Sequence, residues 1–338
     1  MRKIIYFALI GLSVMMVACA TATATVAPKP TPPAPVVRKS GTIRFSIGGD
    51  PNVRDIPRLM AIDALKAQGY TVETTTFASN DLIASAMQRG DIEIGDLTSN
   101  LAWSAIAKGV DIRSVVGRTN MTFYLVTKQS IKTCQDLEGQ RLAFSNRQAV
   151  GYIMYDKYLK ENCPGVNPQI LLIANSKNRV AALEAGELDG AYLELEDWLP
   201  LSSRAGTSFH ILLDFAKQFP QVFFSPFSVR RTWAEQNPEA VKDFIRALLA
   251  ANRRVIANPQ VLRDEIVKRL AIDAVQAQKL ADTYLALKVW DANGGMNQDS
   301  LAYTIDFLSA NGTVSKGIQI NDVADLSYLN AVLDEIGR

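Results

Sequence analysis

The sequence predicts an α/β protein with two lobes, each built on a mostly parallel sheet flanked by helices. Apolar, β-branched runs alternate with amphipathic helical patterns, which is the order that builds a parallel sheet covered on both faces. The 338 residues, 48% of them hydrophobic, exceed the roughly 250 to 300 residues at which a single core stops growing. A helix–turn–strand pattern also occurs twice, so we expect one copy in each lobe.

The start of the chain is typical of a secretory leader. Arg2 and Lys3 supply positive charge, and the apolar stretch 4–18 is shorter than the roughly 20 residues that cross a bilayer. Residues 16–19, Met-Val-Ala-Cys, resemble a bacterial lipobox with Met in place of the usual Leu. We expect residues 1–18 to be a lipoprotein signal peptide and Cys19 to carry a lipid that anchors the protein at the extracytoplasmic face of the cell membrane. An ordinary leader with an incidental cysteine is the alternative.

Residues 19–41 alternate Thr and Ala and then become rich in proline. Such a segment buries too little surface to offset its ordering entropy, and its prolines hold it extended. We therefore expect a tether.

The first lobe is expected from residues 42–119 and 222–338. Predicted strands lie at 42–48, 70–77, 92–97 and 112–119, and predicted helices at 55–68, 80–90 and 99–109. A strand-like run at 222–233 then leads into a helical tail at 237–257, 259–271, 273–287 and 299–310.

The second lobe is expected from residues 120–221. Strands are predicted at 123–128, 140–145, 169–174, 188–194 and 209–214, and helices at 149–161 and 177–187. The chain would cross between the lobes near 119–121 and 219–225, and these crossings form the expected hinge. Ligands in open α/β sheets bind at the carboxyl ends of the strands, so the cleft between the lobes is the expected site.

Two cysteines fall in the second lobe. If strand 141–144 feeds a helix from Val150, that helix returns Cys163 to the end of the strand where Cys134 lies. A disulfide between them would suit an exported protein. Two separate buried thiols are the alternative.

Composition excludes several classes of function. The 36 basic and 34 acidic residues form no excess of positive charge for a nucleic acid. The single histidine, His210, and three cysteines leave little for a metal site or a histidine-dependent nucleophile. We expect no cofactor, no metal and no catalysis.

Four stretches, in this order, resemble the substrate-binding proteins of ABC importers. They are RGDIEIGDLTSNLA at 89–102, DLEGQRLAF at 136–144, ALEAGELDGAYLE at 182–194 and WAEQNPEAVKDFIRAL at 233–248. The resemblance is to the SsuA/THI5-like branch, which takes up sulfonates, nitrate, thiamine-pyrimidine precursors and riboflavin. It implies a type II periplasmic-binding-protein fold, with a ligand held between hinged lobes and delivered to a membrane permease and its ATPase. We expect a monomer.

Strand-to-helix junctions supply the candidate ligand-binding residues, because helix amino ends present free amides and partial positive charge. For each residue, ordinary helix capping is the alternative. Preference goes to Asn100, Ser145 and Asn146. The full set is Gly49, Asp50, Asn52, Asn80, Thr98, Ser99, Asn100, Asn120, Ser145, Asn146, Tyr152, Tyr192, Glu194 and Trp198.

The ligand expected from this inventory is a flat heterocycle. Only Arg54, Arg118 and Arg147 lie near the junctions, which argues against a dianion, whereas Tyr and Trp side chains are plentiful and stack on planar rings. Riboflavin is favoured, and a thiamine-pyrimidine precursor or a sulfonate or nitrate is the alternative. A pyrimidine-synthase-like enzyme is the rival of another class, but His210 begins a predicted strand and is expected to be structural. A sensor lobe for a signalling partner is the third possibility.

Overall fold

The computed structural model describes residues 41–77, 80–204 and 208–338. The expected leader, Cys19 and all of the expected tether except Gly41 lie outside the described residues. Two five-stranded sheets organise the described chain.

The first sheet has the strand order β2-β1-β3-β10-β4. Its strands are β1 (Thr42–Gly48), β2 (Thr71–Phe77), β3 (Ile94–Asp96), β4 (Ile112–Thr119) and β10 (Ser225–Arg230). We call this sheet and the helices packed on it lobe 1. Its helices are α1 (Ile56–Gln68), α2 (Asn80–Arg89), α3 (Ser99–Ala107), α8 (Arg231–Gln236), α9 (Pro238–Ala257), α10 (Pro259–Leu270), α11 (Ala274–Ala286), α12 (Gln298–Ala310), α13 (Ile320–Val323) and α14 (Ser327–Ile336).

The second sheet has the strand order β7-β6-β8-β5-β9. Its strands are β5 (Phe123–Lys128), β6 (Arg141–Phe144), β7 (Gln169–Leu172), β8 (Gly190–Glu194) and β9 (Phe209–Asp214). We call this sheet lobe 2, together with α4 (Val150–Asn162), α5 (Ser176–Glu184), α6 (Leu195–Arg204) and α7 (Phe215–Gln218). The two-lobed α/β prediction is confirmed.

The sheets are mixed, which corrects the expectation that they are mostly parallel. In lobe 1, β1 pairs parallel with β2 and β3, whereas β10 pairs antiparallel with β3 and β4. In lobe 2, β6 pairs parallel with β7 and β8, whereas β5 pairs antiparallel with β8 and β9. β5 and β10 are the strands that enter from the other lobe. They therefore start at the edge where their neighbours end, and must run in the opposite direction.

The two sheets share one plan, as the sequence repeat indicates. The first copy of the helix–turn–strand unit is α2 and β3, and the second is α5 and β8. Both β3 and β8 occupy the centre of their sheet.

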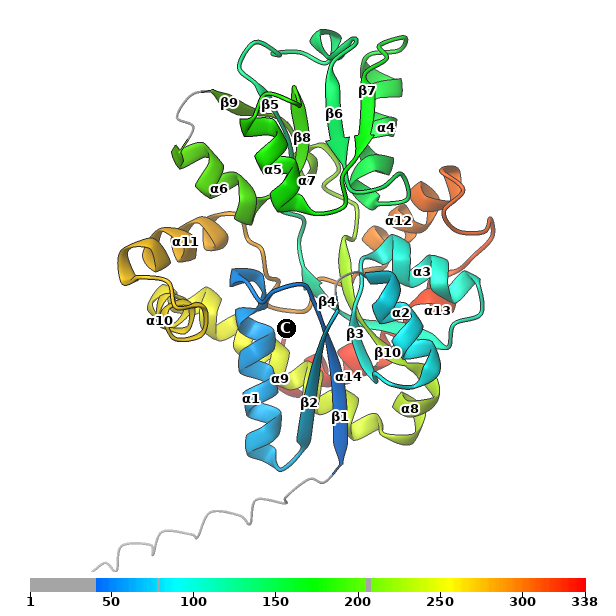
Figure 1. The fold of residues 1–338 in the computed structure, drawn as a ribbon. Coiled ribbons are helices and arrows are strands. Elements are labelled where there is room, and N and C mark those ends of the chain that lie inside the picture. Colours follow the sequence, from blue (N-terminus) through cyan, green and yellow to red (C-terminus); the bar gives the residue numbers. More distant parts are fainter. Residues whose placement is uncertain (1–40, 78–79, 205–207) are drawn as a thin grey trace, which may run out of the picture. The chain divides into compact units, whose positions relative to one another are not determined.

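The core of lobe 1 joins its sheet to the long helix α9. Pro238 opens this helix at a position that tolerates the missing N–H. Phe244 of α9 packs edge-on against Phe45 of β1 and Phe227 of β10, with ring centroids 5.2 and 5.1 Å apart. On the same side α1 packs on α9 and lies beside β2 (Figure 1).

In lobe 2 a disulfide joins Cys134 to Cys163, with Cα atoms 6.1 Å apart. It ties the end of α4, which lies beside β7 (Figure 1), to the turn that precedes β6. The first of the two cysteine alternatives is therefore the one in the structure. None of the described helices is both long and apolar enough to cross a membrane.

Candidate functional site

In the described chain, polar contacts link the carboxyl ends of the strands in lobe 1 to those in lobe 2. Arg54, after β1, forms ion pairs with Glu194 and Glu196, at the end of β8 and in α6. Asn100 Nδ2 donates to the Gln148 carbonyl at 2.8 Å, and Lys177 lies 3.8 Å from Asp50. The strand ends expected to form the site therefore do face one another.

The lobe 1 side contains two arginines with carboxylate partners, Arg58, which is buried, and Arg118, which is partly exposed. Arg58 lies 2.6 Å from Asp96 and 2.8 Å from Asp55, and Arg118 lies 2.7 Å from Asp55. Burial alone would raise the pKa of Asp55, but Arg58 and Arg118 hold it below its usual value. Asp96 also accepts from the Ser46 hydroxyl at 2.6 Å. Both arginines on this side therefore have carboxylate partners within lobe 1.

The turn after β1 is held by its own residues. Asn52 caps the short helix η1 (Val53–Asp55): its Oδ1 accepts from the Arg54 amide at 3.0 Å, and its own amide donates to Asp55 at 3.1 Å. Gly49 has a φ of +73°, which favours glycine. Asp50 is exposed. The side chain of Asn52 therefore acts as a helix cap, which was the alternative to ligand binding.

The amino end of α3 carries polar groups without partners. Thr98, half-buried, stands at the N-cap and makes no side-chain cap bond. Ser99 and Asn100 are buried, and within the described chain neither Ser99 Oγ nor Asn100 Oδ1 has a hydrogen-bond partner. A buried polar atom without a hydrogen-bond partner is costly, so a ligand that supplied the missing hydrogen bonds would relieve that cost.

The lobe 2 side contains an arginine of a different kind. Arg179, in the first turn of α5, is 2% exposed. Its Nε donates to the Tyr192 carbonyl at 2.7 Å, and its Nη1 donates to the carbonyls of Ile173 and Ala174 at 2.7 and 3.0 Å. The guanidinium thus gathers the carboxyl ends of β7 and β8 but forms no ion pair with any carboxylate in the described part of the chain.

Electrostatics around Arg179 agree with an unneutralised charge. Burial lowers its pKa, against opposing contributions from Tyr192 and Glu194. Asp197 is nearby, but its carboxylate accepts from the Ser176 hydroxyl and burial raises its pKa. An anion bound here would relieve the cost of burying the guanidinium alone.

The aromatic side chains largely pack on each other. Tyr192 is 5% exposed, and its ring stacks on Phe123 with centroids 4.9 Å apart and planes 4° apart. A Cβ on Gly151 would lie 2.2 Å from the Tyr192 ring, so that glycine makes room for it. Tyr192 is therefore core, and does not present a face to a ligand.

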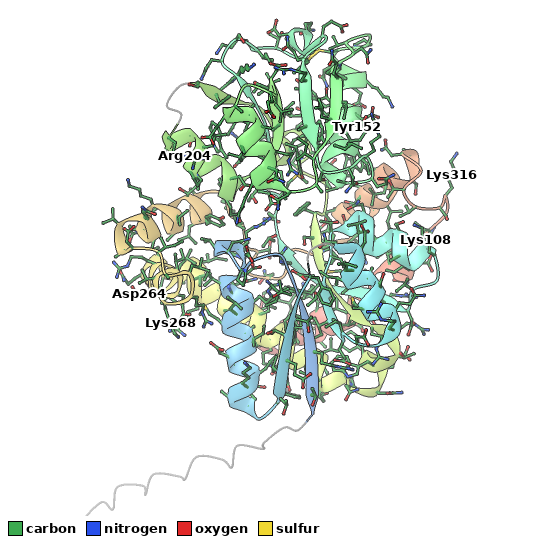
Figure 2. The ribbon with its side chains drawn as sticks, in the orientation of Figure 1. Lys108, Tyr152, Arg204, Asp264, Lys268 and Lys316 are labelled. Atoms are coloured by element: carbon green, nitrogen blue, oxygen red, sulfur yellow. A yellow bond between two sulfur atoms is a disulfide. The ribbon has the colours of Figure 1, made fainter. Side chains whose placement is uncertain are left out.

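Tyr152 and Trp198 are half-buried. Tyr152, on α4 (Figure 2), meets the edge of Phe144 at 5.3 Å, and its hydroxyl accepts from Arg147. It borders a cavity of about 420 Å³ between α4 and the loop 163–168. Trp198 packs against a buried apolar cluster that includes Val180 and Leu183 of lobe 2 and Tyr284 and Trp290 of lobe 1.

The remaining predicted residues divide between the strand ends and the crossing. Asn80 opens α2, and Ser145 and Asn146 follow β6, half-buried and exposed respectively. Asn120 donates to the carbonyls of Val289 and Lys288, which fastens the crossing to lobe 1. Glu194 pairs with Arg54.

Arg179 and Arg58 were missed because both lie inside helices, away from the junctions. A sequence signal for Arg179 exists. When Gly90 is aligned with Gly186 in the two copies of the repeat, Ile83 falls on Arg179, so an arginine occupies a core position of an amphipathic helix.

No group of three or more His, Cys, Asp or Glu side chains among the described residues could hold a metal ion.

Comparisons with known proteins identify the family and the fold of the chain. The model of the family described as NMT1/THI5 like matches residues 65–261. The taurine-binding periplasmic protein of Escherichia coli is 30% identical over 202 residues, which is 58% of this chain and 61% of that protein. The chain thus matches less than two thirds of that relative's length.

Solved structures share the fold at low sequence identity. The periplasmic aliphatic sulphonate binding protein SsuA from Escherichia coli has a TM-score of 0.64 at 16% identity, covering 84% of this chain and 92% of its own. The periplasmic nitrate-binding protein NrtA from Synechocystis has a TM-score of 0.66 at 11% identity, covering 88% and 89%. These likenesses establish the two-lobed periplasmic-binding-protein fold.

Proposed function

We propose that this chain, which belongs to the NMT1/THI5-like family, is the substrate-binding protein of an ABC importer and that it captures a small anion of the sulfonate type. The observation that carries the choice of substrate is Arg179, which is buried in lobe 2 and forms no ion pair with a carboxylate among the described residues. A taurine-binding relative at 30% identity supports the same chemistry.

Two polar atoms at the amino end of α3 have no partner within the described chain: the Ser99 hydroxyl, which can donate, and Asn100 Oδ1, which only accepts. The Ser99 hydroxyl can donate to an anion, and the amino end of α3, nine residues long, presents backbone amides and partial positive charge. A sulfonate would thus meet a guanidinium from lobe 2 and neutral donors from lobe 1.

Riboflavin, favoured by the sequence inventory, is the competing ligand. The inventory counted Tyr192 as a stacking surface, but Tyr192 stacks on Phe123 instead. Tyr152 and Trp198 are the aromatic candidates that keep part of their surface. If riboflavin is the ligand, Tyr152→Ala or Trp198→Ala should weaken its binding, whereas sulfonate binding should change little.

Capture would work by closure of the lobes around the ligand. The segments 120–122 and 219–224 connect the two sheets and form the proposed hinge between residues 120–221 and the rest of the folded chain. The ligand shifts the equilibrium toward the closed form only as far as it binds that form more tightly than the open form. The closed form would then dock on the permease, which works with its ATPase.

The location that we propose is the outer face of the cell membrane. Residues 1–18 would be the signal peptide, Cys19 the lipid-bearing residue and 19–41 the tether that lets a monomeric binder move above the bilayer. The globomycin sensitivity of processing tests the lipid: accumulation of the unprocessed precursor is expected, and unaffected cleavage would favour an ordinary leader.

A ligand panel tests the substrate. Purified protein is titrated calorimetrically with taurine, ethanesulfonate, nitrate, inorganic phosphate and riboflavin, and flavin fluorescence is followed in parallel. We expect saturable binding of at least one sulfonate and no quenching of riboflavin. Quenching of riboflavin without any heat from a sulfonate would reverse the choice of ligand but keep the transport class. Turnover on incubation with pyridoxal phosphate would instead support the enzyme alternative.

A further inference from the structure

We infer that the ligand is a zwitterion, with its anionic group at Arg179 and an ammonium group at Asp197. The inference rests on the proposed function, because it takes the anion at Arg179 as given and narrows the sulfonates to those that also carry a positive charge. Asp197, in the first turn of α6, would then determine which sulfonates bind.

The carboxylate and the guanidinium lie in the same part of lobe 2. Ser176 and Arg179 are three residues apart at the start of α5, so their side chains share one face of that helix. The Ser176 hydroxyl donates to Asp197, and Arg179 donates to the Tyr192 carbonyl of β8. The first turn of α5 therefore holds Asp197 and Arg179 in one neighbourhood.

The two charges act on each other without forming an ion pair. Burial has the largest influence on the pKa of each group, but the charge of Asp197 also raises the pKa of Arg179, and the charge of Arg179 lowers that of Asp197. Among the described residues Arg179 directs Nε and Nη1 at three carbonyl oxygens instead. Neighbouring charges of opposite sign that are not joined suit a ligand that carries one group of each sign.

Asp197 differs from the other acidic side chains described at the site. Arg54, whose charge reaches Asp197, is already paired with two glutamates. Within the described chain the donor to the Asp197 carboxylate is a neutral hydroxyl, and the side chain is half-buried, so a ligand can reach it. The acidic side chains that do have basic partners are Asp50, Asp55, Asp96, Glu194 and Glu196.

A plain anion at Arg179 would be opposed by this carboxylate. Burial raises the pKa of Asp197, and Glu194 adds to the rise, so the ionised carboxylate lacks a compensating charge. An ammonium group beside Asp197 would supply that charge, because an opposite charge at close range favours the ionised form. The same carboxylate would repel a sulfonate that has no positive group, and such a repulsive element contributes to specificity.

Calorimetric titration with taurine and with its hydroxyl analogue isethionate tests the inference, because the two sulfonates differ only in an ammonium group against a hydroxyl. We expect the wild type to bind taurine about tenfold or more tightly than isethionate, as a hydrogen bond to a charged group implies. Asp197→Asn removes the charge but keeps an oxygen that can accept from Ser176. It should lose about tenfold or more of the taurine affinity, whereas the isethionate affinity should not fall. Glu184→Gln, which removes an exposed carboxylate of lobe 2 paired with Arg204, is the matched control and should bind both ligands like the wild type.

The outcomes separate this inference from the proposed function. Equal wild-type affinities for the two sulfonates, or an equal loss of both in Asp197→Asn, would overturn the ammonium site and leave sulfonate capture intact. Binding of neither sulfonate would contradict the proposed capture of sulfonates, and this inference with it. If Asp197→Asn does not fold, the wild-type comparison decides, because the two ligands differ at the ammonium position alone.

Discussion

The two copies of the helix–turn–strand unit differ at one buried helical position. In lobe 1 the position holds Ile83, fully buried, and in lobe 2 it holds Arg179, 2% exposed. At the aligned position of the following strand the partners differ as well: Asp96 in lobe 1 pairs with Arg58, whereas Tyr192 in lobe 2 offers Arg179 a backbone carbonyl and the face of its ring. The same scaffold thus holds a buried arginine with carboxylates in lobe 1 and a buried arginine with carbonyl groups in lobe 2, where we propose that an anion binds.

The largest effect is expected from breaking the balance in lobe 1. Arg58→Met leaves Asp55 and Asp96 buried with one cation fewer, which should lower the free energy of unfolding by about 3 to 5 kcal/mol. Chemical denaturation at neutral pH measures this. Arg231→Met, which removes more exposed ion pairs with Asp111 and Glu235, is the control. A loss of stability in Arg58→Met as small as that in Arg231→Met would contradict the structural role that we assign to Arg58.

The next largest effect is expected from removing the disulfide of lobe 2, a cross-link that the described part of lobe 1 lacks. Replacing Cys134 and Cys163 with Ser opens a loop of 29 residues, and the chain-entropy model gives a loss of about 3 to 4 kcal/mol. Hydrogen exchange should show protection lost first in α4 and β6, while α1 and β1 keep theirs. Equal loss in both lobes would mean that the bridge acts on the whole chain.

A smaller change in stability is expected at Arg179. Arg179→Met removes an unneutralised charge but leaves three carbonyls with one donor fewer, so unfolding should change by only about 1 to 2 kcal/mol. Thermal unfolding beside Arg58→Met measures the contrast. If Arg179→Met costs as much as Arg58→Met, the arginine in lobe 2 is structural like that in lobe 1.

The smallest effect is expected in the pH dependence of stability at Glu196. Burial raises the pKa of Glu196 above its usual value, with Arg54, Glu194, Tyr284 and Tyr124 as its charged or titratable neighbours. A raised pKa stabilises the folded chain at low pH, and this contribution is lost as the pH rises through the raised value. Chemical denaturation across that range should show a modest loss of stability with rising pH in the wild type relative to Glu196→Gln. A gain relative to Glu196→Gln would reverse the sign.

Local patterns predicted the elements well. The strand expected at 42–48 is β1 (Thr42–Gly48), and the helix expected at 299–310 differs from α12 (Gln298–Ala310) by one residue. Alternation could not reveal that β5 and β10 run antiparallel, because direction depends on where the chain enters the sheet. Five helices of the described chain were not predicted, namely α6, α7, α8, α13 and α14. The run expected to be strand-like at 222–233 is a strand only over β10 (Ser225–Arg230), because α8 begins at Arg231.

The site was less predictable, for a physical reason. Junction residues mark where strands end, so the contact of Asn100 with lobe 2 follows from the expected topology. Whether a carboxylate neutralises the charge of an arginine depends on tertiary contacts. Arg54 and Arg118 could be identified near the junctions from the sequence, but both have carboxylate partners in the structure. Counting charges therefore argued against an anion, whereas Arg179, hidden in an amphipathic helix, points toward one.

The most direct test compares sulfonate binding by Arg179→Met with that by the wild type and by Arg204→Met, an exposed arginine of lobe 2 paired with Glu184. Calorimetric titration with ethanesulfonate or taurine should give an affinity about 10- to 100-fold weaker for Arg179→Met, since a charged hydrogen bond contributes about 1.5 to 3 kcal/mol. Arg204→Met should bind like the wild type. An unchanged affinity in Arg179→Met would contradict the anion site.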